Sequence, residues 1–221
     1  PDYDFMLKDF EKEFQIGIDA LLRLTDGKIH LNLDSRYPAS STFANAKGVQ
    51  INKFKGPHPA GNVGTQIHFI DPINKGDVVW TITPHNIITL GRLFLNGQYD
   101  ASRIVALTGS EVKSPRYYKT IGGACLRSLC DDNIKEGSVR YISGNVLSGT
   151  RVSPNSFIGY YDAQLTVIPE GDQYEFLGWL APGFNKFSIS RTFFSWLMPD
   201  KEFKINTNLR GGHRSLMITG S

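Results

Sequence analysis

Cysteine is scarce in this 221-residue sequence, which contains only Cys125 and Cys130. Two cysteines cannot build the disulfide framework of a small secreted domain, and their five-residue spacing on a predicted helix places them on different faces. We therefore expect two buried free thiols in a reducing compartment. The sequence also lacks a Cys-x-x-Cys pair, a Cys/His quartet and a His-Glu-x-x-His motif, so neither a structural zinc ion nor an iron–sulfur cluster is indicated.

Long apolar runs and blocks of like charge are absent as well. The uncharged stretch Val78–Gly91 is broken by Pro84 and falls short of the ~18–20 apolar residues that span a bilayer. The 24 basic and 21 acidic side chains give a formal net charge of only +3, with no run of five or six like charges. Membrane-spanning and nucleic-acid-binding functions are therefore disfavoured, and 40% hydrophobic with 20% charged residues is typical of a globular protein.

The length of the chain fits one large domain or two modest ones. The sequence begins with Pro1 rather than Met and shows no signal-peptide pattern. It stops at Ser221, directly after an apolar run. We expect this sequence to be an excised piece of a longer polypeptide.

Helix-type and strand-type patterns alternate through the first half of the sequence. Apolar residues recur every three to five positions from Phe5 to Leu22, which predicts one amphipathic helix. Thr83 followed by Pro84 predicts the start of a second helix, which runs to Gly97. The alternation predicts an α/β domain with a partly parallel sheet that lacks its first strand. The predicted strands cover Lys28–Leu33, Val49–Lys55, Gln66–Ile70, Asp77–Thr81 and Arg103–Thr108.

Short strands and turns predominate after Gly109, with one short helix at Gly122–Cys130 and a polar loop at Asp131–Ser138. This pattern predicts an α+β module that is β-grasp-like, with a β extension. We place the domain border near Gly109, so that the α/β domain covers residues 1–109 and the β-grasp-like domain covers residues 110–221. The predicted strands cover Arg116–Thr120, Val139–Ser148, Phe157–Tyr161, Gln164–Pro169 and Tyr174–Leu180.

The loop Gly56–Thr65 is the strongest candidate for contact with a ligand. Its three glycines permit close approach of the backbone, and His58 and Thr65 add hydrogen-bonding groups. The spacing of the glycines matches neither the dinucleotide fingerprint G-x-G-x-x-G nor a P-loop. A tight turn between two elements is the alternative interpretation.

No arrangement of side chains supports catalysis or metal binding. The pair Asp131-Asp132 lies in a polar loop, and there is no G-x-S-x-G elbow. The histidines are scattered without nearby carboxylates, which favours ordinary polar roles over metal ligation. They are His30, His58, His68, His85 and His213.

Heavy apolar side chains are concentrated in the segment Phe176–Met198. Their number exceeds what one face of a strand can bury, so the segment is predicted to offer a surface to a partner protein, unless truncation has exposed a former core. The residues expected at this interface are Phe193, Phe194, Trp196 and Leu197.

Several long motifs resemble, in order, those of the A subunit of the Na+-translocating NADH:quinone oxidoreductase. The resemblance spans nearly the whole chain and implies a Rossmann-like α/β domain followed by a soluble-ligand-binding β-grasp (SLBB) domain. Both would come from the middle of that subunit. The motifs are Gly56–Phe69, Val79-Trp80, Gly91–Gly97, Ile142–Gly149, Glu175–Trp179 and Asn185–Thr192.

In that family, the whole complex oxidises NADH, passes electrons through FAD, FMN, riboflavin and iron–sulfur centres in other subunits, reduces a quinone and exports Na+. The resemblance implies a peripheral subunit on the cytoplasmic face of the bacterial inner membrane, beside the other subunits and especially the membrane-embedded B subunit. Similar folds in respiratory complex I and the Rnf complex carry a flavin-phosphate loop or cysteine sets. This sequence has neither, so we expect no cofactor in this piece and no catalysis by it alone.

The resemblance also links the family to quinone binding, and residue chemistry indicates where a quinone could bind. Hydrogen-bond donors from the glycine-rich loop and its neighbours, flanked by Phe69 and Trp80, could form an apolar slot with polar contacts. Two other functions remain open: a free-standing NAD(H) or flavin oxidoreductase, and a non-catalytic SLBB module that binds saccharide or protein. The predicted quinone contacts are His58, Gly61, Gly64, Thr65 and His68.

Overall fold

The computed structural model describes residues 1–57, 59–171, 176–178, 180–187 and 191–203. The chain divides into two compact units, Asp2–Ala101 and the part from Ser102 onward. The division lies before the expected border near Gly109, because the strand predicted at Arg103–Thr108 pairs within the second unit. Among the described helices, none is long and apolar enough to cross a membrane.

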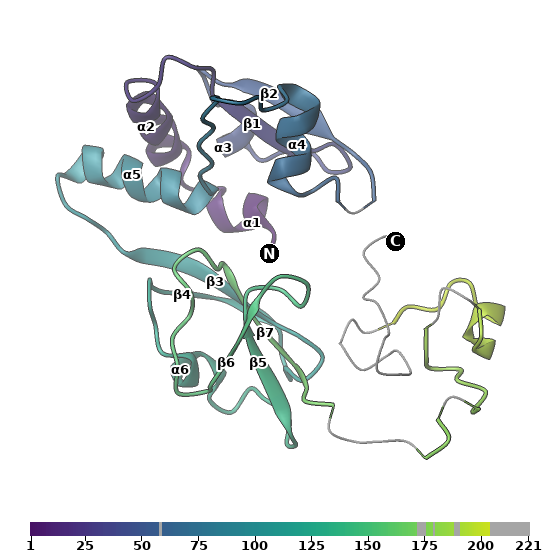
Figure 1. Ribbon diagram of the computed structural model, residues 1–221. Coiled ribbons are helices and arrows are strands. Elements are labelled where there is room, and N and C mark those ends of the chain that lie inside the picture. The colour runs from purple at the N-terminus through teal and green to yellow at the C-terminus, as the bar shows by residue number, and fades with distance from the viewer. Residues whose placement is uncertain (58, 172–175, 179, 188–190, 204–221) are drawn as a thin grey trace. The chain divides into compact units, whose positions relative to one another are not determined.

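The first unit combines five helices with a two-stranded parallel sheet in its described part (Figure 1). The two strands run in register from the pair His30 and Gln50 to the pair Asp34 and Phe54. The elements are α1 (Tyr3–Leu7), α2 (Glu11–Leu21), β1 (His30–Asp34), α3 (Ser41–Ala44), β2 (Gln50–Phe54), α4 (Val63–Ile70) and α5 (Pro84–Asn96).

The single helix predicted from Phe5 to Leu22 is two helices, α1 and α2. The side chain of Asp2 caps α1 by accepting a hydrogen bond from the backbone N–H of Phe5 at 3.1 Å. At the other end, the buried hydroxyl of Thr42 donates to the carbonyls of Leu7 and Lys8 at 2.9 and 3.1 Å. Because Thr42 satisfies these carbonyls, α1 can end before α2 begins.

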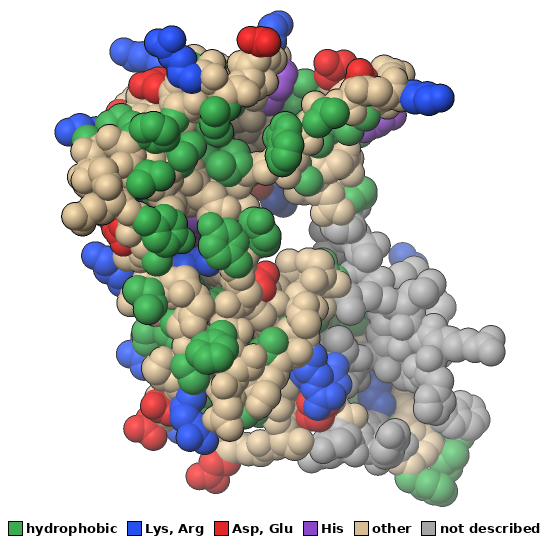
Figure 2. All heavy atoms as spheres, turned by 60° about the vertical axis from the view of Figure 1, so that its left-hand side comes forward, with side chains coloured by type: hydrophobic (Ala, Val, Ile, Leu, Met, Phe, Trp, Pro, Cys, Tyr) green, Lys and Arg blue, Asp and Glu red, His purple; other side chains and the backbone are tan. Residues whose placement is uncertain are grey.

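Helix α5 has the ends that the sequence predicts. Thr83 precedes it in an extended conformation, Pro84 is its first residue, and Gly97 ends it in the left-handed conformation with φ of 68°. It packs closely on α2, where Gly17 and Gly91 permit the approach: a Cβ at Gly91 would lie 1.8 Å from the carbonyl oxygen of Glu13. On the face that carries α2 and α5, Figure 2 shows hydrophobic side chains scattered among polar ones.

Two strands predicted in the first unit are wrong. Gln66–Ile70 belongs to α4, and Asp77–Thr81 forms no strand. Periodicity cannot separate helix from strand in such short apolar runs. In the second case, the structure provides no neighbouring strand in the described residues with which the run could pair.

The second unit is built on a mixed five-stranded sheet in the order β4-β3-β7-β5-β6. Strands β3 and β7 are parallel, and the other neighbours are antiparallel. The apolar face of α6 reaches the core through Leu126 and Cys130, beside Leu165 and Val167. The elements are β3 (Ser102–Thr108), β4 (Arg116–Ile121), α6 (Leu126–Cys130), β5 (Val139–Ser143), β6 (Thr150–Val152), β7 (Gln164–Pro169) and the 3-10 helix η1 (Phe194–Leu197).

Two further strand predictions in the second unit differ from the structure. Phe157–Tyr161 is a loop with one isolated bridge, between Phe157 and Cys125. The prediction at Tyr174–Leu180 lies partly outside the described residues, and its described positions 176–178 form a turn. The mixed sheet with one short helix matches the α+β, β-grasp-like prediction for this unit.

Candidate functional site

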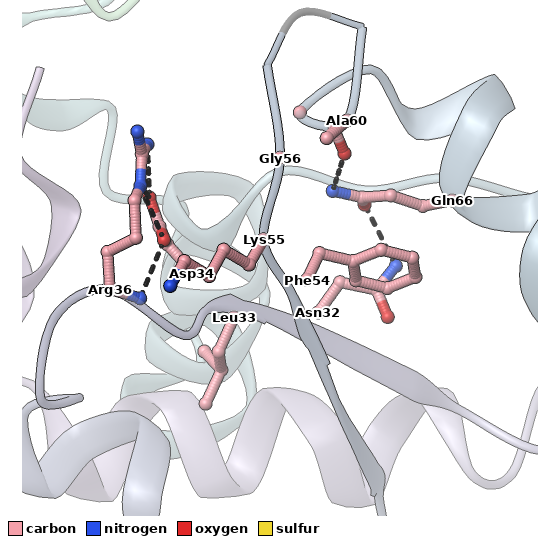
Figure 3. Close-up of a pocket in the computed structure, with 10 residues that line it drawn as sticks. Asn32, Leu33, Asp34, Arg36, Phe54, Lys55, Gly56, Ala60 and Gln66 are labelled. Atoms are coloured by element: carbon pink, nitrogen blue, oxygen red, sulfur yellow. Dashed lines mark hydrogen bonds and ion pairs between the residues drawn. The ribbon is translucent and has the colours of Figure 1, made fainter.

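A hollow lies where the parallel strands β1 and β2 end, beneath the loop that leads to α4 (Figure 3). The carboxyl edge of parallel strands is the usual ligand position in α/β folds, because loops there can close over a bound molecule. Its volume is about 100 Å³. This suits one ring-sized polar group and is too small for a dinucleotide. The lining residues are Asn32, Leu33, Asp34, Arg36, Phe54, Lys55, Gly56, Ala60, Gly61 and Gln66.

A chain of side-chain amides fixes one wall of the hollow. Asn52 donates from Nδ2 to Oδ1 of Asn32 at 2.9 Å, and Asn32 donates from Nδ2 to Oε1 of Gln66 at 2.9 Å. Gln66 in turn donates from Nε2 to the carbonyl of Ala60 at 3.2 Å, as Figure 3 shows. Side-chain hydrogen bonds therefore tie the paired strands to α4, and α4 to the glycine-rich loop.

Charge at the rim of the hollow comes from Asp34, Arg36 and Lys55. Arg36 and Asp34 form an ion pair at 2.6 Å, and the hydrogen bond from Arg36 lowers the pKa of the Asp34 carboxyl. The same contact raises the pKa of Arg36. Since these two charges compensate each other and Lys55 has no ion pair in the described part of the chain, the rim carries an excess of positive charge. Such a rim favours a ligand with carbonyl or anionic oxygens.

Comparison with known proteins places the two units in one family. Residues 1–99 match the family model of the NqrA second alpha/beta domain, and residues 104–153 match that of the NQRA C-terminal domain. The chain belongs to the NqrA family. The SLBB prediction for the second unit is thereby confirmed, as is the resemblance that the motifs carry.

Curated members of the NqrA family are similar over almost the whole chain. The relatives from Rhodopirellula baltica and Pasteurella multocida are 42% and 39% identical over 98% and 100% of this chain. A relative from Vibrio parahaemolyticus is 37% identical over 99% of it. Each is named as the A subunit of a Na(+)-translocating NADH-quinone reductase, and the chain spans only 47–49% of their lengths.

The residues predicted to contact a quinone do not all meet at the hollow. Gly61 lines it, whereas Gly64 and Thr65 lie in the first turn of α4, exposed and half-buried respectively. His68 is exposed, with its ring 5.5 Å from that of Phe69. Two residues correspond to about 200° around a helix, so His68 faces away from the side of α4 that Gln66 presents to the hollow.

His58 lies outside the described residues. Sequence reasoning missed Gln66, Asn32 and Lys55, although Gln66 directly follows the glycine-rich loop. Reading the run at Gln66 as a strand concealed that its side chain turns back toward that loop. The flanking aromatics Phe69 and Trp80 are strongly exposed, at 75% and 89%.

The apolar segment near the end of the described chain contains both buried residues and an exposed ridge. Phe193 is buried beside Gly183, under the ammonium group of Lys186 at 5.7 Å, so it cannot itself form a docking surface. Ser195 is also buried, and its hydroxyl donates to the carbonyl of Lys186. The exposed ridge of η1 consists of Phe194, Trp196 and Leu197.

The two cysteines are free, as predicted; Cys130 is buried and Cys125 is half-buried. Burial raises the pKa of the Cys130 thiol to about 11, with smaller contributions from Asp131 and Cys125. Among the described residues, no group of three or more His, Cys, Asp or Glu side chains could hold a metal ion.

Proposed function

We propose that this chain is part of the A subunit of a Na+-translocating NADH:quinone reductase, in which it supplies structure, docking surfaces and a contact for the quinone. The observation that carries this proposal is the 37–42% identity over 98–100% of the chain to relatives of that name. At such identity over two successive domains, the same assembly is the simplest explanation. The alternatives, a free-standing oxidoreductase or a saccharide-binding module, gain no support from the relatives' names.

In this proposal the chain holds no redox cofactor, and NADH, the flavins, the iron–sulfur centres and Na+ are handled by other subunits. The chain has only two cysteines and the hollow is small, and both facts support this assignment of the cofactors to other subunits. We place the chain at the cytoplasmic face of the bacterial inner membrane, bound to the membrane-embedded B subunit. The exposed ridge Phe194, Trp196 and Leu197 is the proposed contact, because large apolar side chains at a surface are typical of protein interfaces.

The quinone contact is proposed at the hollow, around Gly61. A quinone carbonyl accepts hydrogen bonds, and the ammonium group of Lys55 and the backbone of the loop stand at the rim to donate them. Phe54 supplies apolar surface for one side of the ring. Gly64 and Thr65 lie in the first turn of α4, directly before Gln66 in the sequence, and His68 would serve only a quinone bound on the outer side of the helix.

The test is photo-crosslinking with a quinone analogue in the assembled complex, followed by mapping of the labelled peptide. Labelling is expected at Lys55–Gln66. The variant Gln66→Leu removes the amide that holds the loop at Ala60, so labelling should fall severalfold. Gln98→Leu is the matched control, because Gln98 is exposed and lies on the connection after α5.

Two outcomes would separate the parts of this proposal. Labelling wholly outside residues 1–221 of this chain, in a complex that assembles normally, contradicts the quinone contact and leaves the role in the complex intact. Failure of the full-length protein to co-purify with other reductase subunits contradicts the role in the complex itself.

A further inference from the structure

A second hollow lies within the second unit, bounded by α6, the loop that follows it and β5. Its volume is about 350 Å³, which exceeds that of the hollow beside β1 and β2. This volume is near the lower end of the range for small-molecule sites. The second hollow therefore suits a small metabolite better than a nucleotide or a cofactor.

The floor of the second hollow is apolar and half-buried. Ile134 and Tyr141 form it, and both pack against the core cluster that contains Leu126, Cys130 and Val167. Burial raises the pKa of the Tyr141 hydroxyl, so this group stays neutral at physiological pH. Such a floor can cover an apolar side chain of a ligand, and the Tyr141 ring favours an offset or edge contact with an aromatic one.

Four charged side chains, two of each sign, line the same hollow. Lys113 and Arg127 are the cations, Asp131 and Asp132 are the carboxylates, and all four residues are exposed. In the part of the chain that the structure describes, no ion pair joins any of them to another charged group. Opposite charges that line one hollow without pairing leave both signs available to a ligand.

The loop that carries the two carboxylates is fixed by hydrogen bonds. Asn133 is only 3% exposed; it donates from Nδ2 to the carbonyl of Ser114 and accepts at Oδ1 from the N–H of Ser114, both at 2.9 Å. The N–H of Lys113 donates to the carbonyl of Asn133 at 2.8 Å, and the N–H of Lys135 donates to the carbonyl of Glu111 at 2.9 Å. The rim is therefore preformed, and a ligand need not first order the loop.

Asp132 has a backbone conformation that most side chains avoid. Its φ is 59°, in the left-handed region, and the Nζ of Lys113 donates to its carbonyl at 3.2 Å. Asp and Asn tolerate this region better than other residues apart from glycine. An asparagine at position 132 would therefore keep the conformation of the rim while removing the charge. The ammonium group of Lys113 has three donors, so the contact with Asp132 leaves others for a ligand.

We propose that the second hollow binds a free α-amino acid with an apolar or aromatic side chain. Arg127 would take the carboxylate of the ligand, because a guanidinium offers a carboxylate two parallel N–H donors, and Lys113 adds a second positive charge. The ammonium group of the ligand would pair with Asp131 or Asp132, and its side chain would lie on the apolar floor.

The mixed charge of the rim favours a zwitterion over other small molecules. A ligand with only negative groups would meet the two carboxylates, and one with only positive groups would meet the two cations, and like charges at close range cost binding energy. A metal ion does not fit either, because no group of three or more His, Cys, Asp or Glu side chains among the described residues could hold one. The inference is independent of the proposed quinone contact, since the two hollows lie in different units.

Isothermal titration calorimetry of the full-length protein with L-phenylalanine and L-leucine tests the proposal. We expect saturable binding at one site per chain. Phenylalaninamide lacks the carboxylate and N-acetyl-L-phenylalanine lacks the ammonium group, so each should bind at least ~10-fold more weakly than L-phenylalanine. Absence of saturable binding of both amino acids would overturn the proposal, as would equal or tighter binding of either blocked derivative.

Variants of the rim show which charge meets which end of the ligand. Arg127→Gln should weaken binding of L-phenylalanine at least ~5-fold and remove most of the preference over phenylalaninamide. Asp131→Asn combined with Asp132→Asn should instead remove the preference over N-acetyl-L-phenylalanine. A variant that changed the affinity for all three ligands by the same factor would contradict the assigned contacts, because a general effect of surface charge would then be the cause.

Matched controls come from exposed charges outside the second hollow. Glu136→Gln lies in the same loop as the two carboxylates but does not line the hollow, and Arg23→Gln changes an exposed arginine of the first unit. Both variants should bind the three ligands as the unsubstituted protein does. A loss of binding in Glu136→Gln equal to that in the double Asp variant would overturn the assignment of the ammonium contact.

Discussion

At the scale of single residues, the thiol of Cys130 has an environment that can be measured directly. Burial raises its pKa from 9.0 to about 11. At pH 8 its thiolate fraction is therefore about 100-fold smaller than that of an unperturbed thiol. We expect iodoacetamide to label Cys130 in the native full-length protein far more slowly than the half-buried Cys125. Equal labelling rates would contradict the structure around α6.

The same shift predicts how stability depends on pH. Between about pH 9 and about pH 11 the folded protein keeps the proton on Cys130 that the unfolded chain has lost, so the free energy of unfolding falls as pH rises through this window. Cys130→Ala should make that fall shallower. Urea unfolding of both proteins at several pH values checks the difference in slope; identical slopes would refute it.

Residue chemistry identified the region of the candidate site but not most of its contacts. The glycines of the loop marked where backbone meets a hollow, and Gly61 does line it. The contribution of Gln66 depends on a tertiary contact with Asn32, 34 positions earlier, which local patterns do not encode. Phe193 was expected at a surface and is buried, since sequence cannot rank neighbouring aromatics by exposure.

At the scale of elements, the contact between α2 and α5 depends on two glycines that allow close helix packing. Gly91→Ala would place a Cβ 1.8 Å from the carbonyl oxygen of Glu13, and backbone cannot move aside as a side chain can. We expect a loss of roughly 1–3 kcal/mol or more in the free energy of unfolding, in spite of alanine's better helix propensity.

Gly64→Ala is the matched control for this helix contact. Gly64 lies in α4, and a Cβ there would meet no atom within 4 Å. The substitution should leave stability unchanged or raise it by up to about 1 kcal/mol. Urea unfolding of the two variants provides the comparison, and a similar loss in both would show that the contact with Glu13 is not the cause.

The helices and strands predicted best are those whose first and last residues have strong local backbone preferences. Thr83, Pro84 and Gly97 delimit α5 by local backbone preferences, so its bounds follow from the sequence. The run that became α4 carries no such preference for helix over strand. The break between α1 and α2 involves Thr42, a residue some 34–35 positions away, and so could not be read locally.

At the scale of the whole molecule, the two units correspond to the two family models. Residues 1–99 and 104–153 match separate NqrA domains, and the structural division falls between Ala101 and Ser102. The change to short strands and turns after Gly109 predicted two domains. It did not predict the position of the border between them, because β3 resembles the strands before it. Only its pairing with β4 and β7 shows to which unit it belongs.

The exposed ridge of η1 leads to a prediction about assembly. Trp196 and Leu197 are 51% and 57% exposed, so replacing both by Arg should leave the Tm of the full-length protein nearly unchanged. If the ridge docks on a partner protein, two buried charges at the interface should reduce recovery of the other reductase subunits by about tenfold or more in co-purification. Tyr37→Arg, at an exposed aromatic of the first unit, is the control. Full recovery of the complex with the double variant would exclude the ridge as a docking surface and leave its apolar exposure to be satisfied by the remainder of the NqrA chain.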